Sequence, residues 1–165
     1  MSMGYDGPSR LRMATVTTFG LGHQRPFPGT WGSLPPIAVM ALLLALEVDA
    51  TTTTLVMAAG VVLFTAACVA FGDEAEARFR RKDPSQVVAD ETAGQCVALL
   101  FFPIHHPRVA ALLLASFVLF RLFAIIKPPP VRQMQALPGG PGIVIDDLLA
   151  GLMALICVQF LAILI

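Results

Sequence analysis

The chain has 165 residues, of which 56% are hydrophobic and only 13% are charged, and its mean hydropathy is +0.77. Soluble domains usually contain roughly 45–50% apolar and about 25% charged residues, so this composition indicates a membrane protein. The formal net charge is zero, which excludes the broad basic surface that nucleic-acid binding requires, and we expect no nucleic-acid partner.

The N-terminal region, residues 1–12, is polar and is not followed by a cleavable signal with an apolar core. We expect these residues to be flexible within one integral membrane domain that covers residues 1–165. The stretch 26–33 is rich in glycine and proline and directly precedes the first apolar segment. We therefore expect an interfacial or re-entrant segment near the N-terminus.

Polar breaks divide the rest of the chain into five apolar segments, at about residues 34–46, 55–71, 87–102, 109–126 and 148–165. The first and third are shorter than the roughly 20 residues that span a bilayer, so flanking residues or protein packing must complete them. The pattern predicts an all-α, polytopic membrane protein, a bundle of about five transmembrane helices. Residues 73–82, between the second and third segments, predict a short surface helix.

The lysines and arginines predict the orientation of this bundle. Ten of the 11 lie before the first segment, between the second and third, or at or after the end of the fourth, and only Arg108 lies on the other side. Positive charge is retained on the cytoplasmic side of a membrane. We therefore expect a cytoplasmic N-terminus, an external C-terminus and cytoplasmic loops at 72–86 and 127–140.

Ionisable residues gather at the cytoplasmic ends of the segments, where they usually mark function. Clustered carboxylates repel one another unless a cation neutralises them, and magnesium accepts carboxylate, water and phosphate oxygens as ligands. Arginine and lysine supply donors for a phosphate group, so the composition indicates phosphoryl chemistry. The candidate residues are Asp90, Glu91, Asp146, Asp147, Arg121 and Lys127, with Gly29 and Thr30 in the turn at the same face.

Each of these residues also has a structural explanation. The acidic pairs could be charges favoured at helix N-termini, Arg121 and Lys127 could be interfacial residues, and Thr30 could be a helix cap. All of these explanations would have to hold at one face together, so a shared site is the better interpretation. Gly94 and Gly151, about one turn beyond the acidic pairs, predict close approach of the third and fifth segments.

Four runs of residues carry a further signal: FGLGHQRPFPGTWGS at 19–33, VVADETAGQ at 87–95, FRLFAIIKPPPV at 120–131 and GIVIDDLLAG at 142–151. In this order they resemble the motifs of the phosphatidylglycerophosphatase A family, over nearly the whole chain after about residue 13. The resemblance implies a phosphoric monoester hydrolase of the bacterial inner membrane with its active site facing the cytoplasm. Such an enzyme hydrolyses phosphatidylglycerophosphate to phosphatidylglycerol and phosphate with Mg²⁺, in phospholipid biosynthesis.

On this interpretation the carboxylates share magnesium coordination, directly or through water, and the basic residues bind the terminal phosphate. Water activated at the metal attacks phosphorus, or an aspartyl-phosphate intermediate forms; the sequence leaves both open. The metal and catalytic residues are then Asp90, Glu91, Asp146 and Asp147, and the phosphate-binding residues are Arg121, Lys127, Thr30 and Gly29.

One position departs from the family pattern, which has a catalytic aspartate in the segment FRxxDxxKPxP where this chain has Ala124. Ala124 is three residues from both Arg121 and Lys127 and therefore shares their helix face. Either the chain has lost or relocated a carboxylate, or it carries an inactivating substitution, which is the explanation we favour. The chain as it stands is then expected to be inactive.

Two other classes of function compete with a phosphatase. A non-enzymatic ion or lipid transporter would place its acidic residues through the depth of the bilayer, whereas here they lie at segment ends. A purely structural membrane subunit would show no dependence on magnesium.

Overall fold

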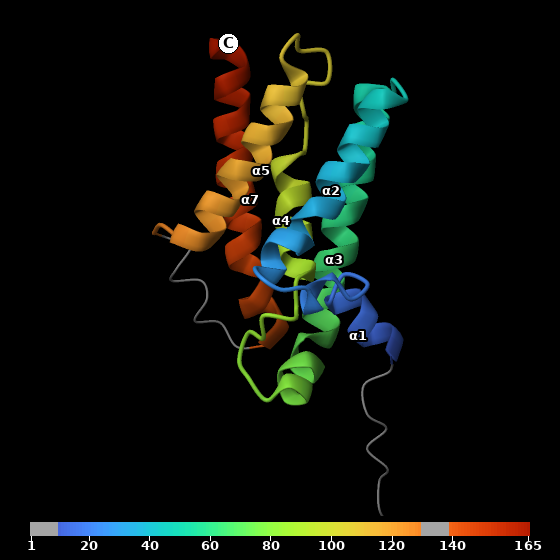
Figure 1. Ribbon diagram of the computed structural model, residues 1–165, viewed down its shortest axis with the longest axis vertical. Coiled ribbons are helices and arrows are strands. Elements are labelled where there is room, and N and C mark those ends of the chain that lie inside the picture. Colours follow the sequence, from blue (N-terminus) through green and yellow to red (C-terminus); the bar gives the residue numbers. More distant parts are fainter. Residues whose placement is uncertain (1–9, 130–138) are drawn as a thin grey trace, which may run out of the picture.

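The computed structural model describes residues 10–129 and 139–165, and every regular element in these ranges is a helix (Figure 1). Within these ranges, four helices are long and apolar enough to cross a membrane. They are α2 (Pro28–Ala45), α3 (Ala50–Phe79), α5 (Val109–Ile126) and α7 (Gly139–Leu164). The predicted all-α, polytopic membrane fold is confirmed.

The outer surface of the bundle is apolar. In the most apolar window of each long helix only 22–28% of the residues are buried, so most of these side chains face outward. Large hydrophobic side chains such as Leu63, Leu114 and Phe160 are more than 60% exposed. This surface suits contact with lipid acyl chains, since in a membrane the apolar groups need no shielding from water.

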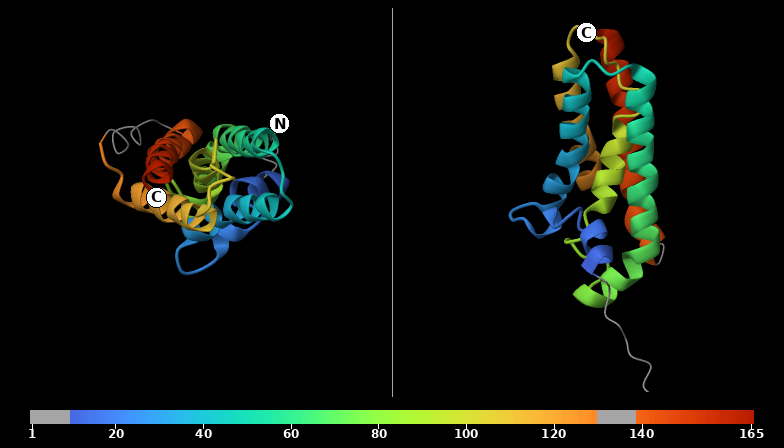
Figure 2. Two further views of the ribbon diagram at one scale, coloured as in Figure 1. Left: turned by 90° about the horizontal axis from the view of Figure 1, so that it is seen from above. Right: turned by 90° about the vertical axis from the view of Figure 1, so that its right-hand side faces the viewer.

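The third apolar segment differs from the long helix expected at 87–102. Only α4 (Ala89–Ala98) is α-helical, and its ten residues rise about 15 Å, half of the roughly 30 Å hydrocarbon thickness. The chain continues through turns at 99–108 to the start of α5 at the opposite end of the bundle (Figures 1 and 2). Non-helical backbone at membrane depth is tolerated where protein covers it.

Helix α4 is covered by other parts of the protein. It contacts α2, α3, α5 and α7, and eight of its ten residues are buried. The third segment is therefore the centre of the bundle, and the other four surround it.

Two glycines let α4 and α7 approach closely. A Cβ added at Gly94 would lie 2.5 Å from the backbone oxygen of Asp147, and one added at Gly151 would lie 2.2 Å from the backbone oxygen of Gly94. No side chain tolerates contacts this short, so glycine is required at both positions. The close approach predicted for these segments is confirmed, and it brings the first turn of α4 beside Asp147.

The prediction of a separate, short surface helix at 73–82 is wrong, because α3 continues without a break to Phe79. Its 30 residues extend about 45 Å, which exceeds the hydrocarbon thickness by about 15 Å. The last ten residues or so, which are the polar ones, therefore project from the apolar part of the bundle. Figure 1 shows this end of α3 at the bottom of the molecule.

The turn expected at 26–33 is wrong in its bounds, because α2 already begins at Pro28. The segment that packs beside the projecting end of α3 lies earlier in the chain. It comprises α1 (Arg10–Val16) and the 3₁₀ helix η1 (Leu21–His23). Arg12 Nη1 pairs with Glu74 Oε1 of α3 at 2.7 Å, and the amide of Val88 donates to the carbonyl of Val16 at 3.0 Å. Residues 10–12 thus begin a helix, whereas the rest of the expected flexible stretch, 1–9, lies outside the described residues.

Candidate active site

Three carboxylates from two helices meet at the polar end of the bundle. Asp90 and Glu91 lie in the first turn of α4, Asp147 lies in α7, and one oxygen from each lies within 4.8 Å of the others. Asp90 Oδ1 and Glu91 Oε2 are buried and have no hydrogen-bond partner among the described residues. Because close carboxylates repel and buried oxygens need a partner, this arrangement fits a hard divalent cation.

The fourth predicted carboxylate, Asp146, lies apart from this cluster. It forms an ion pair with the Nζ of Lys127, the residue that ends α5. Burial alone would lower the pKa of the Lys127 ammonium, but the hydrogen bond and negative charge of Asp146 raise it above its ordinary value. The structure therefore brings three of the four acidic residues together. It pairs the fourth, Asp146, with Lys127, which was predicted to bind the phosphate.

Arg121 of α5 faces the cluster and is anchored by α2. Its Nη1 lies 3.9 Å from Glu91 Oε1 and donates to Ser33 Oγ at 3.4 Å. Ser33 in turn donates to the carbonyl of Gly29 at 2.7 Å. The Nε of Arg121 is buried without a hydrogen-bond partner in the described part of the chain. This guanidinium can therefore donate to an anion in the cavity.

Gly29, in the first turn of α2, touches both charged groups. A Cβ added there would lie 2.0 Å from Glu91 Oε1 and 3.0 Å from Arg121 Nη1. The neighbouring Thr30 is half-buried and does not line the cavity among the described residues. Gly29 thus lies beside Glu91 and Arg121, and phosphate contacts from Gly29 and Thr30 both stay predictions.

These groups enclose a cavity of about 240 Å³. This is below the roughly 300–1,000 Å³ of sites that take drug-sized ligands, so it suits a phosphate-bearing head group and not a whole lipid. The loop between α3 and α4, predicted only as part of a cytoplasmic loop at 72–86, supplies one wall. The lining residues are Arg81, Asp83, Ser85, Val87, Asp90, Glu91, Arg121, Ala124, Lys127 and Asp147.

Ala124 lines the cavity together with Arg121 and Lys127, as their shared helix face predicts. It is 8% exposed, so an aspartate there would place a carboxylate in the cavity wall. Asp83 already supplies a carboxylate to the cavity from the α3–α4 loop. The structure is thus compatible with a relocated carboxylate as well as with a lost one.

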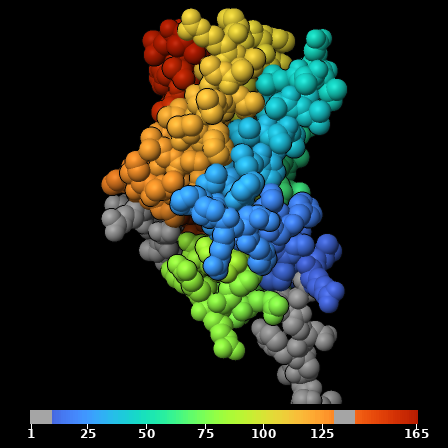
Figure 3. Space-filling view, viewed as in Figure 1, coloured from blue at the N-terminus to red at the C-terminus, as the bar shows by residue number. Residues whose placement is uncertain are grey.

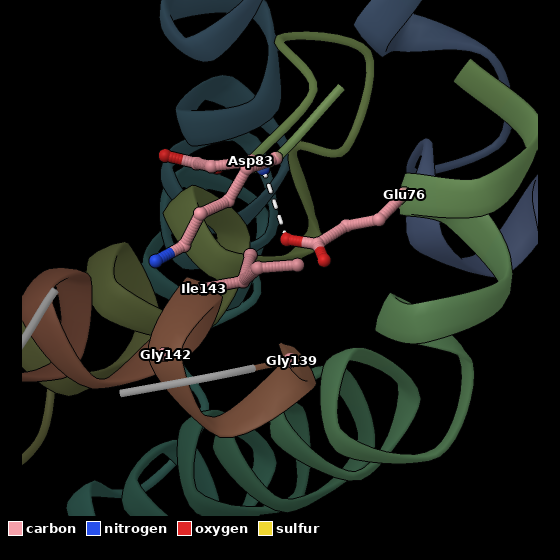
Figure 4. Close-up of a pocket in the computed structure, with 6 residues that line it drawn as sticks. Glu76, Asp83, Gly139, Gly142 and Ile143 are labelled. Atoms are coloured by element: carbon pink, nitrogen blue, oxygen red, sulfur yellow. Dashed lines mark hydrogen bonds between the residues drawn. The ribbon is translucent and has the colours of Figure 1, made fainter. Parts of the chain in front are cut away.

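A hydrogen bond to α3 helps to hold Asp83 in place. Its backbone amide donates to Glu76 Oε1 at 3.0 Å, in a second cavity of about 230 Å³ whose lining includes Gly139 and Ile143 at the start of α7 (Figure 4). Asp83 lines both cavities. The loop wall of the active site is therefore tied to the projecting end of α3.

The chain is similar in sequence to known lipid phosphatases. Residues 14–162 match the family described as phosphatidylglycerophosphatase A. A provisionally named phosphatidylinositol-3-phosphatase of Bacteroides thetaiotaomicron is 40% identical over 152 residues, 92% of this chain and 93% of that protein. The phosphatidylglycerophosphatase A of Haemophilus influenzae is 36% identical over 148 residues, 85% of this chain and 82% of that protein.

The phosphatidylglycerophosphatase A of Escherichia coli is 30% identical over 152 residues, 88% of this chain and 83% of that protein. No solved structure matches the chain significantly. The family match spans most of the chain, including the three carboxylates and Arg121. The chain therefore belongs to the phosphatidylglycerophosphatase A family.

Proposed function

We propose that this chain is a magnesium-dependent lipid phosphatase that hydrolyses phosphatidylglycerophosphate to phosphatidylglycerol and phosphate in bacterial phospholipid biosynthesis. The observation that carries the proposal is the cavity at the polar end of an apolar bundle, with three clustered carboxylates and a buried arginine donor in its wall. Family membership supports the same reaction.

Asp90, Glu91 and Asp147 would hold the magnesium ion, because their oxygens converge and two of them lack other partners. When bound, the ion would offset charge on the phosphoryl oxygens and make a coordinated water more acidic. Asp146 would act indirectly, by holding Lys127 at the cavity wall. An ammonium has three donors, so Lys127 could bind both Asp146 and a phosphate oxygen.

Arg121 would bind the terminal phosphate through its planar fork, in an orientation maintained by Ser33 and Gly29. A water molecule attacks phosphorus, a cavity carboxylate accepts its proton, and the bond from phosphorus to the glycerol oxygen breaks. That oxygen gains a proton to give the alcohol of the product. Direct attack by a carboxylate would instead give an acyl phosphate, which hydroxylamine would trap.

The substrate would remain in the membrane during this reaction. The described lysines and arginines, except Arg108, belong to the end of the bundle that holds the cavity, which favours a site on the cytoplasmic side of the inner membrane. Acyl chains would lie along the exposed helix faces while only the head group occupies the cavity. Selectivity for acyl chains should then be weak.

The alanine at position 124 leaves the cavity without the carboxylate that the family has there, so the chain as it stands should turn over slowly. The decisive experiment is therefore phosphate release by the Ala124→Asp variant, with Mg²⁺ or with a chelator. Phosphatidylglycerophosphate, phosphatidylinositol 3-phosphate and soluble glycerol 3-phosphate should be compared, since one relative's name points to the second of these lipids.

We expect magnesium-dependent release from phosphatidylglycerophosphate and little from the soluble ester. Faster release from the inositol lipid would redirect the substrate assignment and leave the phosphatase assignment intact. Solute or lipid flux across vesicles without phosphate release would instead favour a transporter.

A further inference from the structure

A groove that differs from both cavities described above lies between the N-terminal segment and the projecting end of α3. It has a volume of about 370 Å³ and shares no lining residue with the active-site cavity. Figures 1 and 3 show α1, in dark blue, beside the green lower end of α3. The groove is lined by Arg10, Met13, Ala14, Thr17, Phe19, Gly20, His23, Arg78 and Phe79.

The lining is basic and apolar. Arg10, His23 and Arg78 are its ionisable residues, and no carboxylate lines it in the part of the chain that the structure describes. None of these three side chains forms an ion pair with another described residue. Phe79 lies beside His23, with ring centroids 6.3 Å apart, and Phe19 is 76% exposed. Cationic donors thus lie next to uncovered aromatic surface.

The height of the groove matches the lipid head groups. Phe79 is the last residue of α3, which exceeds the hydrocarbon thickness by about 15 Å. The opposite end of α3 begins at Ala50, just after the polar residues Glu47 and Asp49. With that polar end in the opposite head-group layer, the length of α3, about 45 Å, matches the roughly 40–45 Å of the whole bilayer, so Arg78 and Phe79 lie in the head-group region.

We propose that this groove binds the phosphate of an anionic phospholipid of the surrounding bilayer, as a lipid site separate from the active site. Arg10 and Arg78 donate to the phosphate, and Phe19 and Phe79 contact the glycerol backbone. A free phosphate ion would use the cations and leave the aromatic surface uncovered, so the groove fits a lipid better. The proposal does not depend on the catalytic function.

The test uses the full chain in phosphatidylcholine nanodiscs that contain a small fraction of phosphatidylserine with a photoactivatable group near its head group. Phosphatidylserine is a phosphodiester, so a phosphomonoesterase site should not hold it. We expect cross-links within residues 10–23 and at Phe79, and unlabelled phosphatidylserine should compete for them. Replacing Arg10 and Arg78 by glutamine should raise the concentration of competitor needed roughly tenfold or more.

The matched control replaces Arg25 and Arg80 by glutamine. Both are exposed, lie toward the same end of the bundle and fall outside the groove, so the control has the same net charge as the groove variant. An equal loss of phosphatidylserine binding in both variants would show only a general attraction between charges and would refute a defined site. Cross-links confined to the outer faces of the long helices in the unmodified chain would also refute it, whatever the variants do.

Discussion

Gly29→Ala tests whether α2 forms part of the active site. The added methyl group would lie 2.0 Å from Glu91 Oε1 and 3.0 Å from Arg121 Nη1. Contacts between a Cβ and an oxygen are rarely shorter than 3.0 Å, so the Glu91 carboxylate must retreat by about 1 Å or more. Misplacement of a catalytic group by 1 Å can cost about 10²-fold in rate.

The helix itself should tolerate the change, because alanine is favoured over glycine in helices by about 1 kcal/mol. We therefore expect unchanged or slightly raised thermal stability together with a roughly 10²-fold fall in turnover. The assay is magnesium-dependent phosphate release in the Ala124→Asp background. Weaker binding of Mn²⁺, followed by electron paramagnetic resonance, should accompany the loss because Glu91 is a proposed metal ligand.

Gly60→Ala in α3 is the matched control. Its methyl group would lie 2.7 Å from Cys96 Sγ, and no other heavy atom outside its own helix lies closer than 3.7 Å. It introduces an overlap with a side chain of α4 that is outside the carboxylate cluster. Normal turnover and metal binding in Gly29→Ala, or an equal loss in Gly60→Ala, would refute the role given to Gly29.

Three further predictions use the same active background. Asp147→Asn should lower turnover by about 10²–10³ without loss of fold, the effect typical of removing one preorganised electrostatic group. Near-normal turnover of this variant in a magnesium titration would show that Asp147 is not a metal ligand. Arg121→Lys should lower kcat/KM, because a point charge cannot replace the planar fork of the guanidinium. Unchanged kinetics would indicate that Arg121 is an interfacial residue and not a phosphate ligand. A cysteine introduced at Ser85, which is exposed at the cavity, should resist an impermeant reagent outside intact cells. Labelling there would refute the predicted topology. Cys68 and Cys96 are buried, and the half-buried Cys157 is first replaced by serine so that only the introduced cysteine reports.

The sequence predicted the elements that meet at the site but not which side chains face it. Charges at segment ends identified Asp90, Glu91 and Asp147 because a bundle brings such ends to one level. Asp146 and Asp147 are adjacent on a helix, where successive side chains diverge by about 100°. Only the packing of α5 against α7 decides that Asp146 faces Lys127.

The length of α4 and the wall formed by the α3–α4 loop were not predictable for a related reason. An apolar run of about 16 residues is compatible with a whole helix or with a short helix followed by buried turns, since both hide their backbone from lipid. The charged run before it predicted a surface helix in a cytoplasmic loop and gave no sign of a cavity wall. Asp83 reaches the cavity because the loop folds back and donates to Glu76, a contact between residues seven positions apart.

We propose that this cavity performs magnesium-dependent phosphoester hydrolysis and lacks one carboxylate at position 124. Ala124→Asp adds a carboxylate beside Arg121, and a positioned general base typically contributes about 10²–10⁴ in rate. The measurement is phosphate release from phosphatidylglycerophosphate by the two purified forms at matched magnesium concentration. We predict that the aspartate form is faster by about that factor and that a chelator abolishes its activity. Equal, substantial activity in both forms would show that position 124 is dispensable, and no activity in either folded form would contradict the phosphatase assignment.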